Sequence, residues 1–223
     1  YEAITAPVWS SFYVRHWIVV TAARLIPWRT LQGTVFHATA LRALGATVGE
    51  RVHIHRGVDL SHGGWDLLTI GDDVSIGQDA VIGVVELDGG HVVAGPVTIG
   101  SGAVLDVRAG AAGHTTIGAD AHLTALSSLP AGGVIPAGER WDGVPARPVG
   151  RTSSTPRMTY GRALSPTVHG LVMMGAEAMV VLLRWLPAAA LAVIACALYG
   201  VDIGDLWWWM ETPSVSWQPV AIG

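Results

Sequence analysis

The feature that most constrains this chain is a repeat with a period of six residues between positions 48 and 139. Aliphatic or small residues recur at this spacing in eight consecutive positions: Val93, Ile99, Leu105, Ala111, Ile117, Leu123, Leu129 and Ile135. Two shorter runs with the same spacing precede them: Val48, Ile54, Leu60 and then Ile70, Ile76, Ile82. A period of six fits neither an α-helix of about 3.6 residues per turn nor an alternating strand.

Each repeat also carries a small residue four positions after the aliphatic one, with turn residues between them. Examples are Ile-Gly-Asp-Asp-Val (70–74), Ile-Gly-Ser-Gly-Ala (99–103) and Ile-Gly-Ala-Asp-Ala (117–121). Gly and Asp are typical of tight turns, so each unit of six supplies one face and one corner of a triangular coil. Residues 48–139 therefore predict a β-helix of about five coils with the aliphatic side chains inside.

Two insertions break the period. Four extra residues lie between Leu60 and Ile70, and the register shifts by five between Ile82 and Val93. Because the repeat is intact on both sides, we expect loops that project from the coil at 61–69 and 83–92. Loops on a regular scaffold often hold functional residues, and a tolerated insertion is the alternative for each.

Apolar residues outside the repeat gather at the two ends. Charged residues make up 13% of the chain, below the roughly 25% of an ordinary soluble domain. Residues 3–31 predict a membrane-helix end or an interfacial helix, with a buried globular helix as the alternative. Residues 168–201 are a stronger membrane candidate, in which Pro187 either kinks one tilted span or separates two shorter segments.

These patterns predict four regions. They are an N-terminal apolar helix region (1–40), a hexapeptide-repeat domain (41–150), a linker (151–166) and a membrane helix region (167–223). Arginines in the segment 147–162 favour the cytoplasmic side of a membrane for the repeat domain. Because the chain starts at Tyr1 rather than Met, we expect it to be a piece of a longer protein.

Charge and cysteine content exclude several classes of function. The net charge of −4 gives no reason to expect nucleic-acid binding, and the chain has no lysine for a Schiff base. A single cysteine, Cys196, excludes an internal disulfide and a cysteine-based zinc cluster. Residues 48–139 hold eleven acidic residues and three arginines. This balance would attract a cationic acceptor, although Asp also simply suits turns.

The repeated Ile-Gly-x-x-Ala unit resembles that of the hexapeptide-repeat acyltransferases, whose fold is a left-handed parallel β-helix. The segment Trp-Asp-Gly-Val-Pro-Ala-Arg (141–147) is similar to the motif that closes the last coil in that superfamily. The segment 41–49 resembles its usual entry into the first coil. A repeat domain between apolar segments, with Gly-Pro-Val-Thr-Ile-Gly (95–100) after an insertion, further resembles the C-terminal membrane region of poly-amino-acid-synthetase-type nonribosomal peptide synthetases. This narrower resemblance rests on arrangement more than on motifs.

The resemblance implies acyl or aminoacyl transfer to an amine acceptor, in the terminal, membrane-bound part of a nonribosomal-peptide-synthetase-like protein. A histidine would act as the general base, and a carboxylate would orient it. The candidates in the two insertions are His91, His62 and Glu86, with His91 first because Glu86 and Asp88 lie near it in sequence. A structural histidine is the alternative for each. The narrower family also implies a histidine three residues before Glu86, where this chain has Gly83.

The acyl donor would be a thioester of coenzyme A or of carrier-protein phosphopantetheine. The residues that match the superfamily's coenzyme A contacts are Ser127, Ser128, Gly143, Pro145, Ala146 and Arg147. Their alternative role is structural, with Trp141 sealing the end of the prism. The expected partners are the lipid bilayer, an acyl or aminoacyl carrier, a small amine acceptor, and tandem or oligomeric β-helix neighbours.

Two other functions were considered for the prism. A zinc centre like that of the γ-type carbonic anhydrases is not expected, because the spacing of His114 and His122 does not fit the usual ligand pair. The non-enzymatic alternative is a rigid docking or assembly scaffold between membrane helices.

Overall fold

The structure is a computed structural model that describes residues 3–58, 60–152 and 165–199. By its contacts the chain divides into two compact units, Tyr1–Met174 and Gly175–Gly223. The first unit holds the repeat and the N-terminal helices, and most of helix α4 (Pro166–Tyr199) lies in the second.

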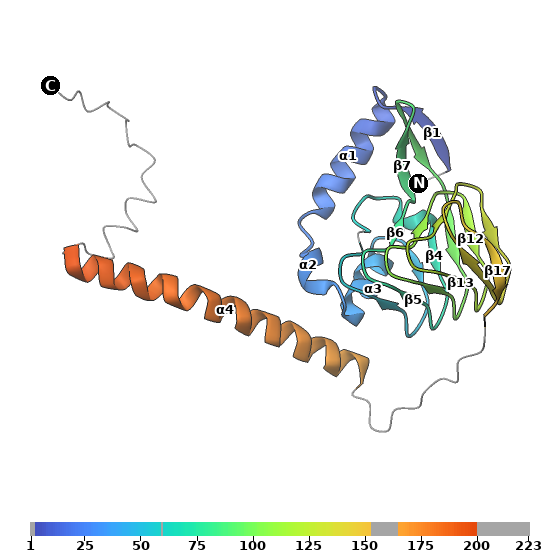
Figure 1. Ribbon diagram of the computed structural model, residues 1–223. Helices are drawn as coiled ribbons and strands as arrows, with labels where there is room; N and C mark the ends of the chain where they lie inside the picture. The colour runs from blue at the N-terminus through green and yellow to red at the C-terminus, as the bar shows by residue number, and fades with distance from the viewer. Residues whose placement is uncertain (1–2, 59, 153–164, 200–223) are drawn as a thin grey trace. The chain divides into compact units, whose positions relative to one another are not determined.

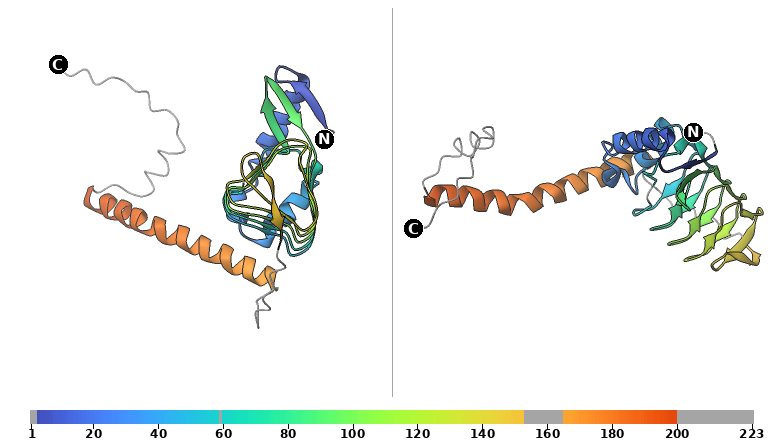
Figure 2. Two further views of the ribbon diagram at one scale, coloured as in Figure 1. Left: turned by 45° about the vertical axis from the view of Figure 1, so that its right-hand side comes forward. Right: turned by 90° about the horizontal axis from the view of Figure 1, so that it is seen from above.

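Three parallel sheets form the walls of a prism (Figures 1 and 2). The first wall stacks β2 (Thr47–Val48), β4 (Leu68–Ile70), β9 (Val97–Ile99), β12 (Thr115–Ile117) and β15 (Val134–Ile135). The second stacks β3 (His53–Ile54), β5 (Ser75–Ile76), β10 (Val104–Leu105), β13 (His122–Leu123) and β16 (Glu139–Asp142), and β17 (Arg147–Arg151) pairs antiparallel with β16. The third stacks β6 (Val81–Ile82), β11 (Gly110–Ala111) and β14 (Ser128–Leu129). The five strands of the first wall correspond to five coils, which confirms the predicted parallel β-helix.

The register places equivalent residues of successive coils directly above one another. On the first wall Ile70 pairs with Ile99, Ile99 pairs with Ile117, and Ile117 pairs with Ile135. All four side chains are at most 1% exposed. Burial of this continuous aliphatic column is the main favourable contribution to the stability of the prism.

The glycine after each inward isoleucine lets the next coil pass close by. A Cβ atom on Gly100 would lie 2.5 Å from the backbone nitrogen of Ala119, and one on Gly118 would lie 2.5 Å from that of Ala137. Parallel strands in a sheet are about 4.8 Å apart, which leaves no room for a side chain at these corners. The Ile-Gly pair therefore fills the core with one residue and permits stacking with the next.

The second insertion projects from the prism, but as a hairpin rather than a loop (Figure 1). Strands β7 (Val85–Asp88) and β8 (His91–Ala94) pair antiparallel, and β8 also pairs with β1 (Ile4–Pro7). Val93 lies on this hairpin, and the coil resumes only at Val97. The prediction that Val93 belongs to the series of inward residues was therefore wrong, because its spacing matches the repeat only by coincidence.

The first insertion does not project, so the prediction of a protruding loop at 61–69 was wrong. A short 3₁₀ helix, η1 (Trp65–Leu67), leads directly into β4 of the first wall. Trp65 is only 4% exposed, its Nε1 donates a hydrogen bond of 2.6 Å to the carbonyl of Leu60, and its ring stacks on Trp28. Burial of the large indole ring, with its N–H group hydrogen-bonded, favours a conformation in which this insertion packs against the core.

Three N-terminal helices lie against the prism: α1 (Ser11–Ala23), α2 (Trp28–Leu31) and α3 (Val35–Ala43). Helix α3 contacts strands of the first coil, and its Leu41 is fully buried in the core. The 13 residues of α1 rise about 20 Å, which is less than the roughly 30 Å of a bilayer's apolar core. Helix α1 alone therefore does not cross a membrane.

Helix α4 contains 34 residues and continues through Pro187. Of the two possibilities left open by the sequence, the structure has a single helix. Its segment Pro166–Leu198 has a mean hydropathy of 2.2 and is long and apolar enough to cross a membrane. Residues 200–223 of the predicted membrane region lie outside the described part of the chain.

We predict that Gly100→Ala lowers the free energy of unfolding of the domain by about 1–3 kcal/mol, as in other overpacked sites. The added methyl group would collide with the backbone of the next coil at Ala119. Urea unfolding of the detergent-solubilised chain, followed by far-UV circular dichroism, measures the effect. The control is Thr116→Ala on the exposed side of β12, and equal stability of the two variants would contradict the stacking argument.

Candidate active site

Two adjoining grooves lie at the root of the hairpin, where it meets α1 and the residues before η1. Their volumes are about 220 Å³ and about 240 Å³, and both are lined by His62, Val85 and Glu86. The first is completed mainly by α1, through Tyr13, His16, Trp17, Val20 and Arg24. The second is completed mainly by the prism, through Gly57, Asp79, Val81, Ile82 and Gly83. The structure thus brings His62 and Glu86 to one site from two separate insertions.

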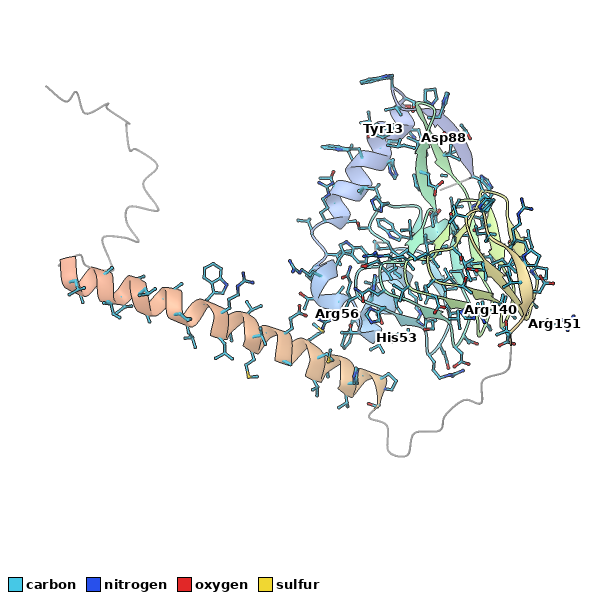
Figure 3. The ribbon with its side chains drawn as sticks, in the orientation of Figure 1. Tyr13, His53, Arg56, Asp88, Arg140 and Arg151 are labelled. Carbon is cyan, nitrogen blue, oxygen red and sulfur yellow. The ribbon has the colours of Figure 1, made fainter. Side chains whose placement is uncertain are left out.

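The end of the domain that holds this site can be followed in Figure 3. Tyr13 of α1 and Asp88 of β7 are labelled where the helix and the hairpin lie side by side. The site is therefore built by elements added to the prism, while the prism supplies its floor.

Glu86 lies on β7, which is the edge strand of the three-stranded sheet β1–β8–β7. Its side chain folds back over Gly83, where an added Cβ atom would come within 2.6 Å of the carboxyl carbon of Glu86. Burial raises the pKa of Glu86, and the neighbouring Asp88 raises it further. The absence of a side chain at Gly83, where the resemblance implied a histidine, thus makes room for the carboxylate of Glu86.

A second histidine, His16 on α1, packs beside His62. An added Cβ atom on Gly63 would lie 3.0 Å from Cε1 of His16. Burial lowers the pKa of His16, and the charge of His62 lowers it further, so the neutral imidazole is favoured. In the sequence, His16 is only a polar residue within the apolar segment 3–31, and nothing there points to a role in the site.

His91 lies at the other end of the hairpin and lines neither groove. It pairs with Asp88 across the strands, whereas Glu86 pairs with Val93. The ring is exposed, and its Nδ1 is 3.2 Å from the carbonyl oxygen of Gly89 in the turn. Asp88, rather than Glu86, is therefore the carboxylate beside His91.

The residues expected to contact coenzyme A lie on the last coils. Ser127 is 1% exposed, and its hydroxyl donates to Asp142 and accepts from the backbone N–H of Gly143 at 2.9 Å. The backbone of Ser128 accepts a bond from Ala146 and donates one to Gly143. These bonds hold the final turn on the prism. Hydrogen bonds from Thr124 and Ser127 lower the pKa of Asp142.

The other two residues expected to contact coenzyme A, Pro145 and Arg147, lie beside the same turn. Pro145 follows a cis peptide bond after Val144, and Arg147 begins β17 with an exposed side chain. Trp141 packs against the core at this end and donates to Glu139 through Nε1. The observed contacts account for a structural cap, and the exposed Arg147 is the member of the set that a phosphate could reach.

A separate imidazole–carboxylate pair lies on the second wall. Nε2 of His122 is 2.8 Å from Oδ2 of Asp106, and the histidine side chain is 22% exposed. From the sequence, His122 was considered only as a metal ligand, and its pairing with Asp106 was not predicted. Val104 pairs with His122, eighteen residues later on the next coil. Asp106, two residues after Val104, therefore lies on the coil next to that of His122. Within the described ranges, no three His, Cys, Asp or Glu side chains gather as a metal site.

No family model matches the chain. It is 32% identical over 165 residues to a delta-poly-L-ornithine synthetase of Acinetobacter baumannii, an alignment that covers 71% of this chain and 12% of that protein. It is also 32% identical over 105 residues to a UDP-3-O-acylglucosamine N-acyltransferase of a Caulobacter species, over 47% of this chain and 26% of that enzyme. The chain thus spans only a small part of both relatives. The two matches support the resemblance to the hexapeptide-repeat acyltransferase superfamily.

Two solved structures resemble part of this chain at TM-scores below 0.5. A maltose O-acetyltransferase from Clostridium difficile has a TM-score of 0.49 and 17% identity, over 68% of this chain and 94% of that one. A hexapeptide-repeat acetyltransferase from Vibrio cholerae, in complex with acetyl coenzyme A, has a TM-score of 0.46 and 15% identity, over 66% and 92% of the two chains.

We predict that Glu86→Gln stabilises the domain at neutral pH and has little effect in acid. Because the pKa of Glu86 is raised in the native state, its stabilising contribution is complete below the ordinary value of 4.5 and is lost as the pH rises through the raised value. The glutamine stays neutral throughout. Urea unfolding at about pH 4 and about pH 7 measures the difference, with the exposed Glu50→Gln as control. A difference that does not change with pH would contradict this account.

Proposed function

We propose that the groove shared by His62 and Glu86 is a site of acyl or aminoacyl transfer from a thioester to an amine, in the terminal, membrane-bound part of a nonribosomal-peptide-synthetase-like protein. The observation that carries the proposal is the meeting of His62, His16 and Glu86 around one pair of grooves. The two curated relatives, a poly-amino-acid synthetase and an N-acyltransferase by name, support this class of reaction.

In this mechanism His62 is the general base. Its neutral imidazole takes a proton from the amine, the amine nitrogen attacks the thioester carbonyl, and a tetrahedral intermediate forms. Collapse of the intermediate forms the amide, breaks the carbon–sulfur bond and returns the proton from the imidazolium to the departing thiolate. A positioned base of this kind contributes roughly 10²- to 10⁴-fold in rate.

Glu86 and His16 support this base in different ways. The carboxylate of Glu86 faces the same groove as His62 and, once ionised, stabilises the imidazolium or holds a cationic acceptor. The pKa of His16 is lowered by burial and by His62, so His16 adds no fixed positive charge to the groove. Asp79 on the prism side, which lies 3.7 Å from Arg108, also favours an acceptor whose second group, not the attacking amine, is cationic.

The third wall connects this groove to the candidate donor site. Val81 and Ile82 of β6 line the groove, and Ser128 lies on β14 of the same wall, two strands away. Two strand spacings amount to about 10 Å. A pantetheine arm lying along this wall would place its thioester near His62 and its attached phosphate near Arg147. A coenzyme A thioester and a carrier-protein thioester both fit this arrangement.

The second candidate function is a non-catalytic docking or assembly scaffold. Two observations favour it: Gly83 stands where the narrower family has a histidine, and the hydrogen bonds of the last coil are those of a cap. In that role the rigid prism would position a carrier domain and tandem or oligomeric neighbours beside the membrane.

Helix α4 supports membrane association of the chain, because it is long and apolar enough to span a bilayer. The cytoplasmic location of the prism stays a prediction from the arginines that precede this helix. Protease access from the outside of intact cells to the prism around residue 110 would overturn it.

We predict that His62→Ala lowers amide formation by at least about 100-fold, the bottom of the range for a lost general base. His91→Ala, in the exposed turn of the hairpin, should stay within a few-fold of the unsubstituted chain. Release of thiol from aminoacyl-pantetheine, together with mass spectrometry of the product, measures the rate with cationic amino acids as acceptors. Circular dichroism shows whether each variant is folded.

Three outcomes separate the candidates. Loss of activity in His62→Ala alone supports the His62–Glu86 groove as the catalytic site. Loss in His91→Ala with activity retained in His62→Ala would move the site to the hairpin turn. If both variants keep full activity, or if the folded unsubstituted chain has none, the docking function replaces catalysis.

A further inference from the structure

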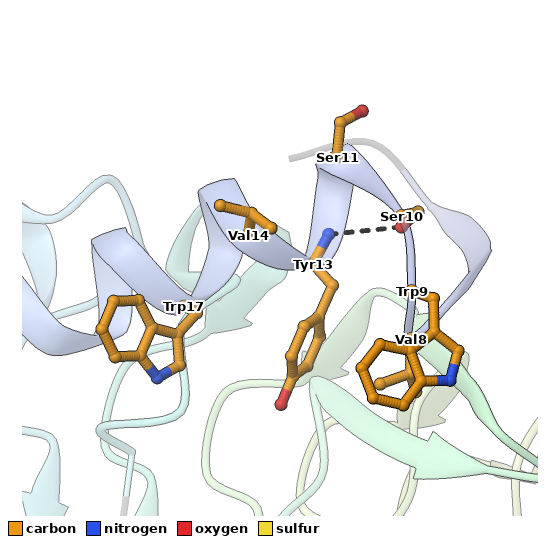
Figure 4. Close-up of a pocket in the computed structure, with 7 residues that line it drawn as sticks. All are labelled: Val8, Trp9, Ser10, Ser11, Tyr13, Val14 and Trp17. Carbon is orange, nitrogen blue, oxygen red and sulfur yellow. Dashed lines mark hydrogen bonds between the residues drawn. The ribbon is translucent and has the colours of Figure 1, made fainter.

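The outer face of α1 carries a row of large apolar and aromatic side chains. Val14, Trp17 and Ile18 of α1 are each more than half exposed, and Trp9, just before the helix, is almost fully exposed. Trp9, Val14 and Trp17 help to line an open groove of about 520 Å³, whose lining residues are drawn in Figure 4. Ser10 fixes the start of the helix, since its hydroxyl accepts a hydrogen bond from the backbone N–H of Tyr13.

This face is uncovered in the part of the chain that the structure describes. Trp9 is 98% exposed, Trp17 is 56% exposed and Ile18 is 55% exposed. The opposite face of α1 packs against the domain, where Ala23 is buried and His16 and Val20 lie close to Gly63. A helix that is apolar on both faces is normally covered on both, so the outer face requires a partner.

The charge of this end of the unit indicates the chemistry of that partner. Residues 3–49 contain four arginines and no Asp or Glu: Arg15, Arg24, Arg29 and Arg42. The prism segment 48–139 has the opposite sign, with eleven acidic residues and three arginines. Arg15 is exposed on α1 next to the outer apolar residues. A surface that combines exposed tryptophans with arginines is suited to lipid acyl chains and anionic headgroups together.

We infer that the outer face of α1 binds the surface of an anionic phospholipid bilayer, with Trp9, Trp17 and Ile18 at the boundary between headgroups and acyl chains. A second copy of the same face is disfavoured, because it would bring arginines against arginines. The chain also carries α4, which is long and apolar enough to enter a bilayer, so the domain is covalently linked to a second segment suited to a membrane.

Spin labelling of the full chain tests this inference, because α4 alone would bring any variant to vesicles. Replacement of the single cysteine by Cys196→Ala allows one label at a time at Val14→Cys or Ile18→Cys, both on the exposed face. Leu126→Cys, exposed on the prism, is the matched control. Each labelled chain is reconstituted in phosphatidylcholine vesicles with and without phosphatidylglycerol. Collisions of the label with oxygen and with a water-soluble nickel chelate are then measured by power saturation.

We expect oxygen to relax the labels at 14 and 18 more strongly than the nickel chelate does, and the reverse at 126. The preference for oxygen should increase with phosphatidylglycerol and decrease in the Arg15→Gln background. Labels at 14 and 18 that the nickel chelate reaches as readily as the control would show a face open to water and overturn the inference. Labels that neither reagent reaches would show a protein partner instead of lipid, which also overturns it.

Discussion

The structure depends on the close parallel stacking of coils, which are held by backbone hydrogen bonds across gaps too narrow for a side chain at the corners. Inward isoleucines fill the prism, while glycines such as Gly100 and Gly118 leave space for the backbone of the next coil. Each coil is thereby fixed in register with its neighbours, as the stacked Ile99 and Ile117 show. Extra residues beyond eighteen per coil cannot be accommodated within the strands of this stack and must be placed at a corner.

This constraint explains how the candidate site forms. The first insertion follows Leu60, and the second follows Ile82 on β6 of the next coil. The two insertions therefore begin at the same corner of the prism, where the first packs inward, the second projects as a hairpin, and His62 and Glu86 line one groove. The helix α1 closes the site from the outside and contributes His16. The candidate residues are thus brought together by the regularity of the prism rather than by any local sequence motif.

The six-residue period was sufficient to predict the β-helix and its number of coils, because a long-range repeat reports directly on stacking. It failed at Val93, where an antiparallel strand happened to share the spacing, and at Trp65, whose burial draws the first insertion inward. The position of His62, rather than His91, beside Glu86 could not be predicted from sequence, because distance along the chain says little about which hairpin residue faces the prism. The contribution of His16 could not be predicted for a similar reason, because only the packing of α1 brings it close to His62.

The central claim is that a thioester donor lies along the third wall with its reactive end at the His62–Glu86 groove. Cross-linking with a pantetheine thioester that carries a photoreactive acyl group, mapped by mass spectrometry, tests it most directly. The account predicts cross-links in residues 57–64 and 79–88, and competition by the unlabelled thioester. Cross-links confined to the second wall around His122 and Asp106, or none that the unlabelled thioester displaces, would contradict it.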